Sequence, residues 1–224
     1  TGTPARVDKR SIDFSKMEEQ KGDERVVPFS FETDPESIQK EQVSCWLTYT
    51  NNETHKIIRD NIDRSPLFSG MIEGTGPRYC PSIEDKVVKF SDKPQHQIFL
   101  EPESKEMNTI YVQGFSTSLP HDVQEEMIRT IPGLENCEIV RYGVMHRNTY
   151  IQGPKVLNKY YQTQNREDLF FAGQITGVEG YLESASSGMV AGINMARLIQ
   201  GKELIDFTAD TVIGSLSNYV ATPN

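Results

Sequence analysis

The stretch GPRYCPSIEDK, residues 76–86, places one thiol among charged side chains and two prolines. Cys80 follows Arg78 by two residues and precedes Lys86 by six. Positive charge near a cysteine favours the thiolate, which is the nucleophilic form. A thiolate can add to an electrophilic carbon, and a nearby carboxylate such as Glu84 can act as acid or base. The residues alone leave a second interpretation open, because free cysteine is most often a small buried residue.

A second stretch, FFAGQITGVEGYLESASSGMVAGIN, has the pattern of a strand, a glycine-rich turn and a helix. Gly173, Gly177 and Gly180 would let the backbone approach a flat or phosphorylated ligand closely. The start of a helix presents unsatisfied N–H groups that stabilise anions or polarised carbonyls. The spacing is GxxxGxxG rather than the GxGxxG of a first dinucleotide motif. Tight packing of the helix against a sheet explains the pattern equally well.

Several strands must position these two stretches. Alternating and β-branched residues predict strands over 44–50, 95–103 and 137–145, and over 108–115 as the antiparallel neighbour of 95–103. Residues 26–33 are predicted as an edge strand because they contain a proline. The apolar run 168–174 is predicted as a fully buried strand.

Three helices are expected between and after these strands. Thr50 and Glu53 fit a capping box, and the helix that they begin should end before Ser65. The segment 119–133 is amphipathic, and its predicted buried side is Val123, Met127, Ile128 and Ile131.

The last helix starts near Leu182 and should be capped by Gly201. One stripe of this helix is expected to be small enough for close packing: Ser184, Gly188, Ala191 and Gly192.

Composition excludes several classes of protein. The 224 residues carry a formal net charge of −9, which argues against a dedicated polyanion-binding protein. Three scattered cysteines describe neither a disulfide framework nor a metal site, and they suit a reducing cytoplasmic location. No apolar run is long enough to cross a membrane.

The stretch AGQITGVEGYLESASSGMVAGINMA resembles the closing flavin-binding motif of the GidA/MnmG family of tRNA-modifying flavoproteins, and of its smaller relative TrmFO. In this family the motif lies along the ribityl chain and the isoalloxazine of FAD. By position, the resemblance implies that the flavin is surrounded by Gly173, Gln174, Gly177, Gly180, Tyr181 and Glu183.

The stretch GTGPRYCPSIEDKVVKF resembles the other signature of the same family, and further matches run through about residue 136. The resemblance implies transfer of a one-carbon unit from methylenetetrahydrofolate to C5 of the wobble uridine of tRNA, with FAD as cofactor and NADH as reductant. It implies the GTPase MnmE as partner and a homodimer. Cys80 becomes the candidate catalytic thiol, with Arg78 and Glu84 beside it.

Two departures keep alternatives open. From about residue 137 the chain resembles TrmFO more than MnmG, which implies a folate- and FAD-dependent tRNA uridine methyltransferase as the alternative. No GxGxxG motif for the FAD pyrophosphate occurs in residues 1–224, so this chain alone should retain little flavin. A non-catalytic binding module is therefore the third candidate.

The expected fold class is α/β, with part of a two-dinucleotide-fold FAD-binding core and an inserted β-rich subdomain. Residues 1–24 are assigned to the core as an extended segment, and residues 25–155 to the inserted substrate subdomain. Residues 156–204 are assigned to the closing strand, turn and helix of the FAD-binding domain, and 205–224 to a tail.

Overall fold

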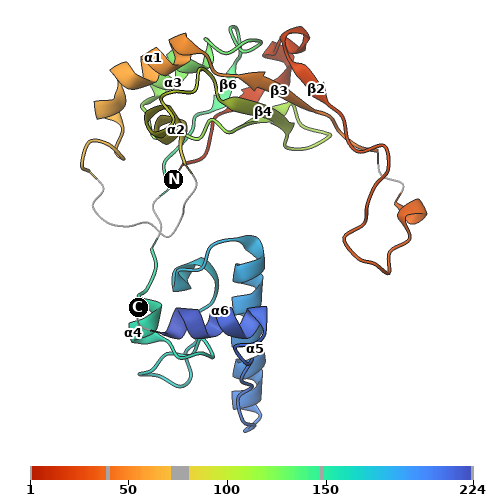
Figure 1. The fold of residues 1–224 in the computed structure, drawn as a ribbon, viewed down its shortest axis with the longest axis vertical. Coiled ribbons are helices and arrows are strands. Elements are labelled where there is room, and N and C mark those ends of the chain that lie inside the picture. The colour runs from red at the N-terminus through yellow and green to blue at the C-terminus, as the bar shows by residue number, and fades with distance from the viewer. Residues whose placement is uncertain (1, 39–40, 72–80, 147–148, 223–224) are drawn as a thin grey trace. The chain divides into compact units, whose positions relative to one another are not determined.

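The chain forms two compact units, seen in a computed structural model that describes residues 2–38, 41–71, 81–146 and 149–222 (Figure 1). The first unit contains the described residues before 147, and the second contains those after 148. Each unit has its own cluster of buried apolar side chains.

A six-stranded antiparallel sheet with the order β2-β3-β4-β5-β1-β6 is the base of the first unit. The strands are β1 (Arg6–Asp8), β2 (Glu18–Gln20), β3 (Cys45–Tyr49), β4 (Gln97–Pro102), β5 (Thr109–Gln113) and β6 (Ile139–Arg141). The strands predicted over 44–50, 95–103 and 108–115 are confirmed as β3, β4 and β5, and β4 pairs with β5 antiparallel as expected. The strand predicted over 137–145 is confirmed only in its middle, as β6.

Three helices pack with this sheet: α1 (Asn52–Asp60), α2 (Ile83–Lys89) and α3 (His121–Ile128). Alternate residues of β4 and β5 are buried in the shared core, as Ile98 and Leu100 show, because side chains alternate between the faces of a strand. All four residues predicted for the buried side of the 119–133 segment are at most 1% exposed. Four short 3-10 turns lie at Lys9–Ser11, Phe14–Lys16, Pro35–Ser37 and Ile62–Arg64. The last of these turns is tied to α3, because Arg64 pairs with Asp122 at 2.8 Å.

The edge strand predicted over 26–33 is wrong. These residues form bends and turns that lead away from the sheet, while β2 pairs directly with β3 (Figure 1). Phe29 and Phe31 are fully exposed. An aromatic, β-branched composition forms a strand only beside a partner, and this segment has none among the described residues.

The capping box of α1 begins one residue later than predicted. Asn51 is the N-cap: its side chain accepts from the Thr54 backbone N–H, and the Thr54 hydroxyl accepts from the Asn51 N–H. The Thr50 hydroxyl is engaged elsewhere, because it accepts from the His96 N–H and lies 2.8 Å from His55 Nε2. Asparagine is at least as good a cap as threonine, so the helix loses nothing by the shift.

This histidine pair predicts a pH dependence of stability. Burial lowers the pKa of both His55 and His96 below 6.5. Positive charge on His96 lowers the pKa of His55 further, and the Lys86 ammonium lowers the pKa of His96 further. The unfolded chain therefore binds these protons more readily, and the free energy of unfolding should fall as pH drops below about 6.5. Urea titrations at pH 7.5 and 5.5 measure this loss. Replacing both histidines by glutamine should flatten the profile in this interval, and an unchanged slope would contradict the assignment.

The second unit is built from α4 (Gly153–Val156), a 3-10 turn at Gly173–Thr176, α5 (Tyr181–Ile199) and α6 (Val212–Ala221). The predicted end of the long helix is confirmed. Gly201 has φ +65°, its N–H donates to the Leu198 carbonyl, and the Lys202 N–H donates to the Arg197 carbonyl. These two bonds are the Schellman arrangement that glycine permits after a helix.

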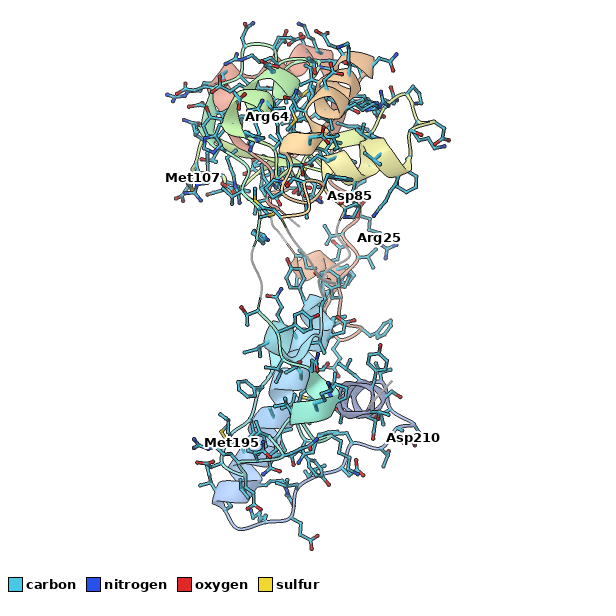
Figure 2. The ribbon with its side chains drawn as sticks, turned by 90° about the vertical axis from the view of Figure 1, so that its left-hand side faces the viewer. Arg25, Arg64, Asp85, Met107, Met195 and Asp210 are labelled. Atoms are coloured by element: carbon cyan, nitrogen blue, oxygen red, sulfur yellow. The ribbon has the colours of Figure 1, made fainter. Side chains whose placement is uncertain are left out.

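The stripe of small residues on α5 does not form one packed face. Ala191 is buried, but Gly188 and Gly192 are exposed and face away from the packed side. Met195 lies on the same outer part of the helix and is 39% exposed (Figure 2). The residues that bury α5 within its unit are instead Ser187, Val190, Ala191 and Asn194.

The buried strand predicted over 168–174 is wrong. Phe170 makes one isolated antiparallel bridge with Gln162, and the Phe171 N–H donates to the Tyr161 carbonyl. Phe170, Phe171 and Ala172 are only partly buried. A central strand needs partners on both sides, and the described part of this unit provides one bridge.

The fold therefore mixes helices with an antiparallel sheet. The dinucleotide-fold core and the assignment of functions to residues 1–24, 25–155, 156–204 and 205–224 stay predictions. Across the described ranges, no group of three or more His, Cys, Asp or Glu side chains could hold a metal ion. None of the helices in those ranges combines the length and apolarity that a membrane crossing requires.

Candidate functional site

The glycine corner, defined as residues 173–183, is the first candidate site. Gly173, Gly177 and Gly180 have φ values of +74°, +87° and +96°. L side chains rarely adopt these values, so the corner needs glycine at all three positions. A Cβ at Gly173 would have no neighbour within 4 Å in the described part of the chain, and a Cβ at Gly177 would first meet Tyr150 at 3.9 Å. The backbone at these two glycines can therefore be approached closely.

Ser187 anchors the corner to the long helix. Its hydroxyl, fully buried, accepts from the Gly173 N–H at 2.8 Å and donates to the Ser184 carbonyl at 2.7 Å. The Thr176 hydroxyl donates to the Gly173 carbonyl and closes the 3-10 turn. Sequence reasoning missed Ser187. The sequence feature that could have indicated its role is a serine within the helix, next to the small-residue stripe. A hydroxyl at such a position can form a hydrogen bond with a neighbouring backbone group.

The start of α5 has an unusual cap. Gly180 is the N-cap residue, and no side chain in the described ranges makes a capping hydrogen bond there. A Cβ at Gly180 would lie 2.0 Å from Glu183 Oε2, so the Glu183 carboxylate folds back over the glycine. This carboxylate balances the positive end of the helix. The corner therefore suits hydroxyl groups or a polarised neutral ring better than a phosphate.

A cavity of about 630 Å³ lies beside the corner and includes Gly177 and Glu183 in its lining. Two of the six residues predicted to hold the cofactor thus lie together on one cavity wall. The other four, Gly173, Gln174, Gly180 and Tyr181, lie in the same corner but outside that lining. Tyr181 is 97% exposed.

The backbone of the corner predicts the effect of a substitution. Gly177→Ala should lower the free energy of unfolding of the second unit by about 1 kcal/mol, because alanine is strained at φ +87°. Gly188→Ala is the matched control: this glycine is helical and open, so alanine should raise stability by about 0.5–1 kcal/mol. Thermal unfolding of both variants measures the two effects. If Gly177→Ala is as stable as the unchanged chain, alanine is not strained at position 177 and the prediction is wrong.

The second candidate site is the cysteine stretch, of which Cys80 and Arg78 lie outside the described residues. Helix α2 begins just after it, with Ser82 as N-cap in a capping box with Asp85. Glu84 is fully buried. Its Oε1 accepts from the Thr117 hydroxyl at 3.1 Å, the Ser118 N–H at 2.8 Å and the Ser118 hydroxyl at 3.0 Å. Glu84 thus fastens the start of α2 to residues 117–118.

The two described cysteines are poor nucleophiles. Burial raises the pKa of the Cys137 thiol to about 11, and Cys137 is 1% exposed in the core. Burial also raises the pKa of Cys45, with Glu101 adding to the effect. Both thiols are therefore protonated near neutral pH.

The family model described as "Glucose inhibited division protein A" matches residues 1–203, which include both candidate sites. The chain belongs to this family. The match also covers most of the part after residue 137, so one family accounts for the residues before and after that position.

The relatives agree. The protein named tRNA uridine 5-carboxymethylaminomethyl modification enzyme MnmG from Lachnoclostridium phytofermentans is 60% identical over 205 residues, which are 92% of this chain and 32% of that protein. The MnmG of Clostridium botulinum is 54% identical over 99% of this chain and 35% of its own length. The chain thus spans about a third of the curated relatives that it matches.

Two solved structures of Aquifex aeolicus GidA have the same fold. The form I crystal gives a TM-score of 0.82 at 47% identity, with 99% of this chain and 38% of that chain covered. The form II crystal gives 0.78 at 45% identity, with 99% and 36% covered. The similarity extends over both compact units.

Proposed function

We propose that the chain is part of an FAD-dependent enzyme that adds a folate-derived one-carbon or aminomethyl group to C5 of the wobble uridine of tRNA. The observation that carries the proposal is the family match over residues 1–203, which contain the glycine corner and the cysteine stretch together. The proposal includes NADH as reductant, methylenetetrahydrofolate as carbon donor, MnmE as partner, a homodimer and a cytoplasmic location.

The glycine corner fits a flavin. Gly173 and Gly177 leave the backbone open to close approach, and no side chain in the described ranges makes a capping hydrogen bond at the start of α5. We assign the ring and the ribityl chain to Gly173, Gln174, Gly177, Gly180, Tyr181 and Glu183. The Glu183 carboxylate would accept hydrogen bonds from ribityl hydroxyls, because carboxylates accept and hydroxyls donate. Bound FAD would supply the redox step that NADH drives.

Cys80 is the proposed nucleophile, since C5 of uracil attacks poorly until a group adds at C6. The thiolate forms a bond to C6, and the electron pair of the C5–C6 double bond moves toward C5 and the O4 carbonyl. C5 then attacks the methylene carbon carried by the folate, and one bond from that carbon to a folate nitrogen breaks, so that the nitrogen takes the electron pair and a proton. An incoming amine replaces the second folate nitrogen on the same carbon and gives up a proton, while the released folate nitrogen takes one up. Removal of the C5 proton by a base restores the double bond and expels the thiolate. Arg78 and Lys86 would favour the thiolate. Glu84 would position the segment that carries Cys80, because its bonds hold the start of α2.

Nucleoside mass spectrometry tests the proposal. The full-length protein is expressed in a bacterial strain that lacks its own wobble-uridine enzyme, and its tRNA is digested. We expect a 5-aminomethyl-type uridine at the wobble position. Appearance of 5-methyluridine instead would support the TrmFO-type alternative, and absence of both would support a binding module.

A further inference from the structure

One serine hydroxyl joins the two parts of the chain that flank the cysteine stretch. The Ser118 hydroxyl donates to Glu84 Oε1 at 3.0 Å and lies 2.7 Å from the Ser65 hydroxyl. A hydroxyl has a single hydrogen, so Ser118 accepts from Ser65. Ser65 precedes Cys80 in the sequence, and Glu84 follows it. The chain on both sides of the proposed nucleophile is therefore tied to one atom, the Ser118 hydroxyl oxygen.

The part before the cysteine stretch is attached at residues 64 and 65. Ser65 is fully buried, and its carbonyl accepts from the Phe68 and Ser69 N–H groups at 3.0 and 2.9 Å. Its neighbour Arg64 pairs with Asp122 of α3 at 2.8 Å. Both side chains of this ion pair are exposed to solvent, so the pair contributes little to stability. The hydrogen bond of the buried Ser65 hydroxyl is therefore the more important attachment.

The part after the cysteine stretch is attached to the same place by three further hydrogen bonds. Glu84 Oε1 also accepts from the Thr117 hydroxyl at 3.1 Å and from the Ser118 N–H at 2.8 Å. The Ile83 N–H donates to the Ser116 carbonyl at 2.7 Å. We call residues 116–118 the clasp, because they bind the chain on both sides of the cysteine stretch.

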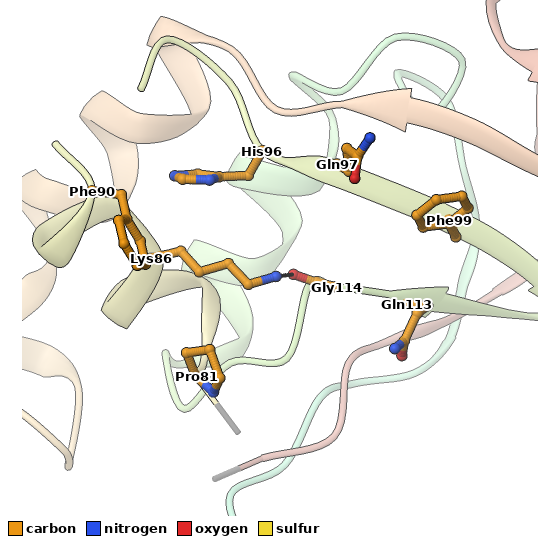
Figure 3. Close-up of a pocket in the computed structure, with 8 residues that line it drawn as sticks. All are labelled: Pro81, Lys86, Phe90, His96, Gln97, Phe99, Gln113 and Gly114. Carbon is orange, nitrogen blue, oxygen red and sulfur yellow. Dashed lines mark hydrogen bonds between the residues drawn. The ribbon is translucent and has the colours of Figure 1, made fainter. Parts of the chain in front are cut away.

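Helix α2 has a second attachment, which fixes a positive charge. The Lys86 ammonium donates at 3.0 Å to the carbonyl of Gly114, the residue that follows β5 (Figure 3). Pro81, which directly follows Cys80 in the sequence, lines a cavity of about 410 Å³ together with Lys86 and Gly114 (Figure 3). The clasp and the Lys86 bond thus hold the start of α2 and one of the two cations proposed to favour the Cys80 thiolate.

We propose that Ser118 is a positioning residue for the Cys80 thiol. The proposal rests on the proposed function, because it takes Cys80 as the nucleophile. Ser118 acts through the chain rather than on the substrate: joining two points of a chain reduces the conformations available to the residues between them. The thiol is thereby held where it can add to C6 of the base, and close to the charge of Lys86.

Single-turnover modification of tRNA by the full-length protein is the first test. A displacement of about 1 Å can lower a rate by about 10²-fold. Ser118→Ala keeps the backbone bonds of the clasp, so we expect a smaller loss, about tenfold in the rate constant, with the dissociation constant of tRNA unchanged. Ser118→Thr keeps the hydroxyl and should restore most of the rate. Ser116→Ala is the matched control and should have the normal rate, because Ser116 binds α2 through its backbone carbonyl.

Alkylation of Cys80 by iodoacetamide is the second test, and it needs neither tRNA nor flavin. Peptide mass spectrometry follows the alkylation rate of Cys80 in the 224-residue chain as a function of pH. Ser118→Ala should move the midpoint of this profile to higher pH, because the thiolate loses its fixed position near Lys86. Ser65→Ala should move it in the same direction, although it leaves every bond of Glu84 in place.

Three results would overturn the proposal: a normal rate of modification in Ser118→Ala, an equal loss in Ser118→Thr, or a Cys80 profile that neither alanine variant moves. Thermal unfolding of each variant verifies that it is folded. If Cys80 is not the nucleophile, Cys80→Ala modifies tRNA normally, and the alkylation profile still reports whether Ser118 positions the thiol. Failure of the proposed function is therefore distinguishable from failure of this proposal.

Discussion

Cys80→Ala in the full-length protein is expected to lower the rate of tRNA modification by on the order of 10³-fold. Alanine removes the atom that would bond to C6 of uracil, and without that bond C5 remains a poor nucleophile. The measurement is single-turnover modification of an unmodified tRNA transcript, with the new nucleoside quantified by mass spectrometry. Flavin content and tRNA affinity should stay unchanged, because the thiol acts on the base rather than on binding.

Cys45→Ala is the matched control for this experiment. Burial raises the pKa of Cys45, so its thiol is protonated near neutral pH and its removal should leave the rate intact. A normal rate for Cys80→Ala, or an equal loss in both variants, would show that the thiol at position 80 is not the nucleophile.

Glu84→Ala has the second large expected effect, a loss of about 3 kcal/mol in the free energy of unfolding of the first unit. Alanine would leave the Ser118 N–H and the Thr117 hydroxyl buried without their acceptor, and it would open a cavity in the core. Urea unfolding followed by circular dichroism measures the loss.

Glu84→Gln separates positioning from proton transfer. The amide oxygen can still accept the hydrogen bonds that Oε1 accepts. Glu84→Gln should therefore retain most of the stability that Glu84→Ala loses. Glu126→Ala, at an exposed position, should change stability by less than about 0.5 kcal/mol. If Glu84→Gln folds normally but the full-length enzyme loses its activity, Glu84 transfers a proton, and the positioning role is wrong.

Local patterns in the sequence predicted much of the first unit. Strands β3, β4 and β5 follow alternation, and α3 follows the spacing of its apolar residues. The segments 26–33 and 168–174 have strand-like composition yet form no strand. Composition cannot reveal whether a pairing partner exists, since partners come from distant parts of the chain.

The candidate sites were predicted by motif rather than by contact. The positive φ values of Gly173, Gly177 and Gly180 agree with the requirement for glycine in the corner. The Ser187 anchor and the bonds of Glu84 to residues 117–118 depend on tertiary packing, which no local pattern records. The cavity beside Lys86 likewise combines residues from α2, β4 and β5.

A crystal structure of the full-length protein with FAD bound tests the central claim most directly, through the residues that contact the flavin. We predict that the isoalloxazine and the ribityl chain lie against Gly173, Gly177 and Glu183 of the glycine corner. A flavin bound elsewhere, with no part of it beside the glycine corner, would contradict the account.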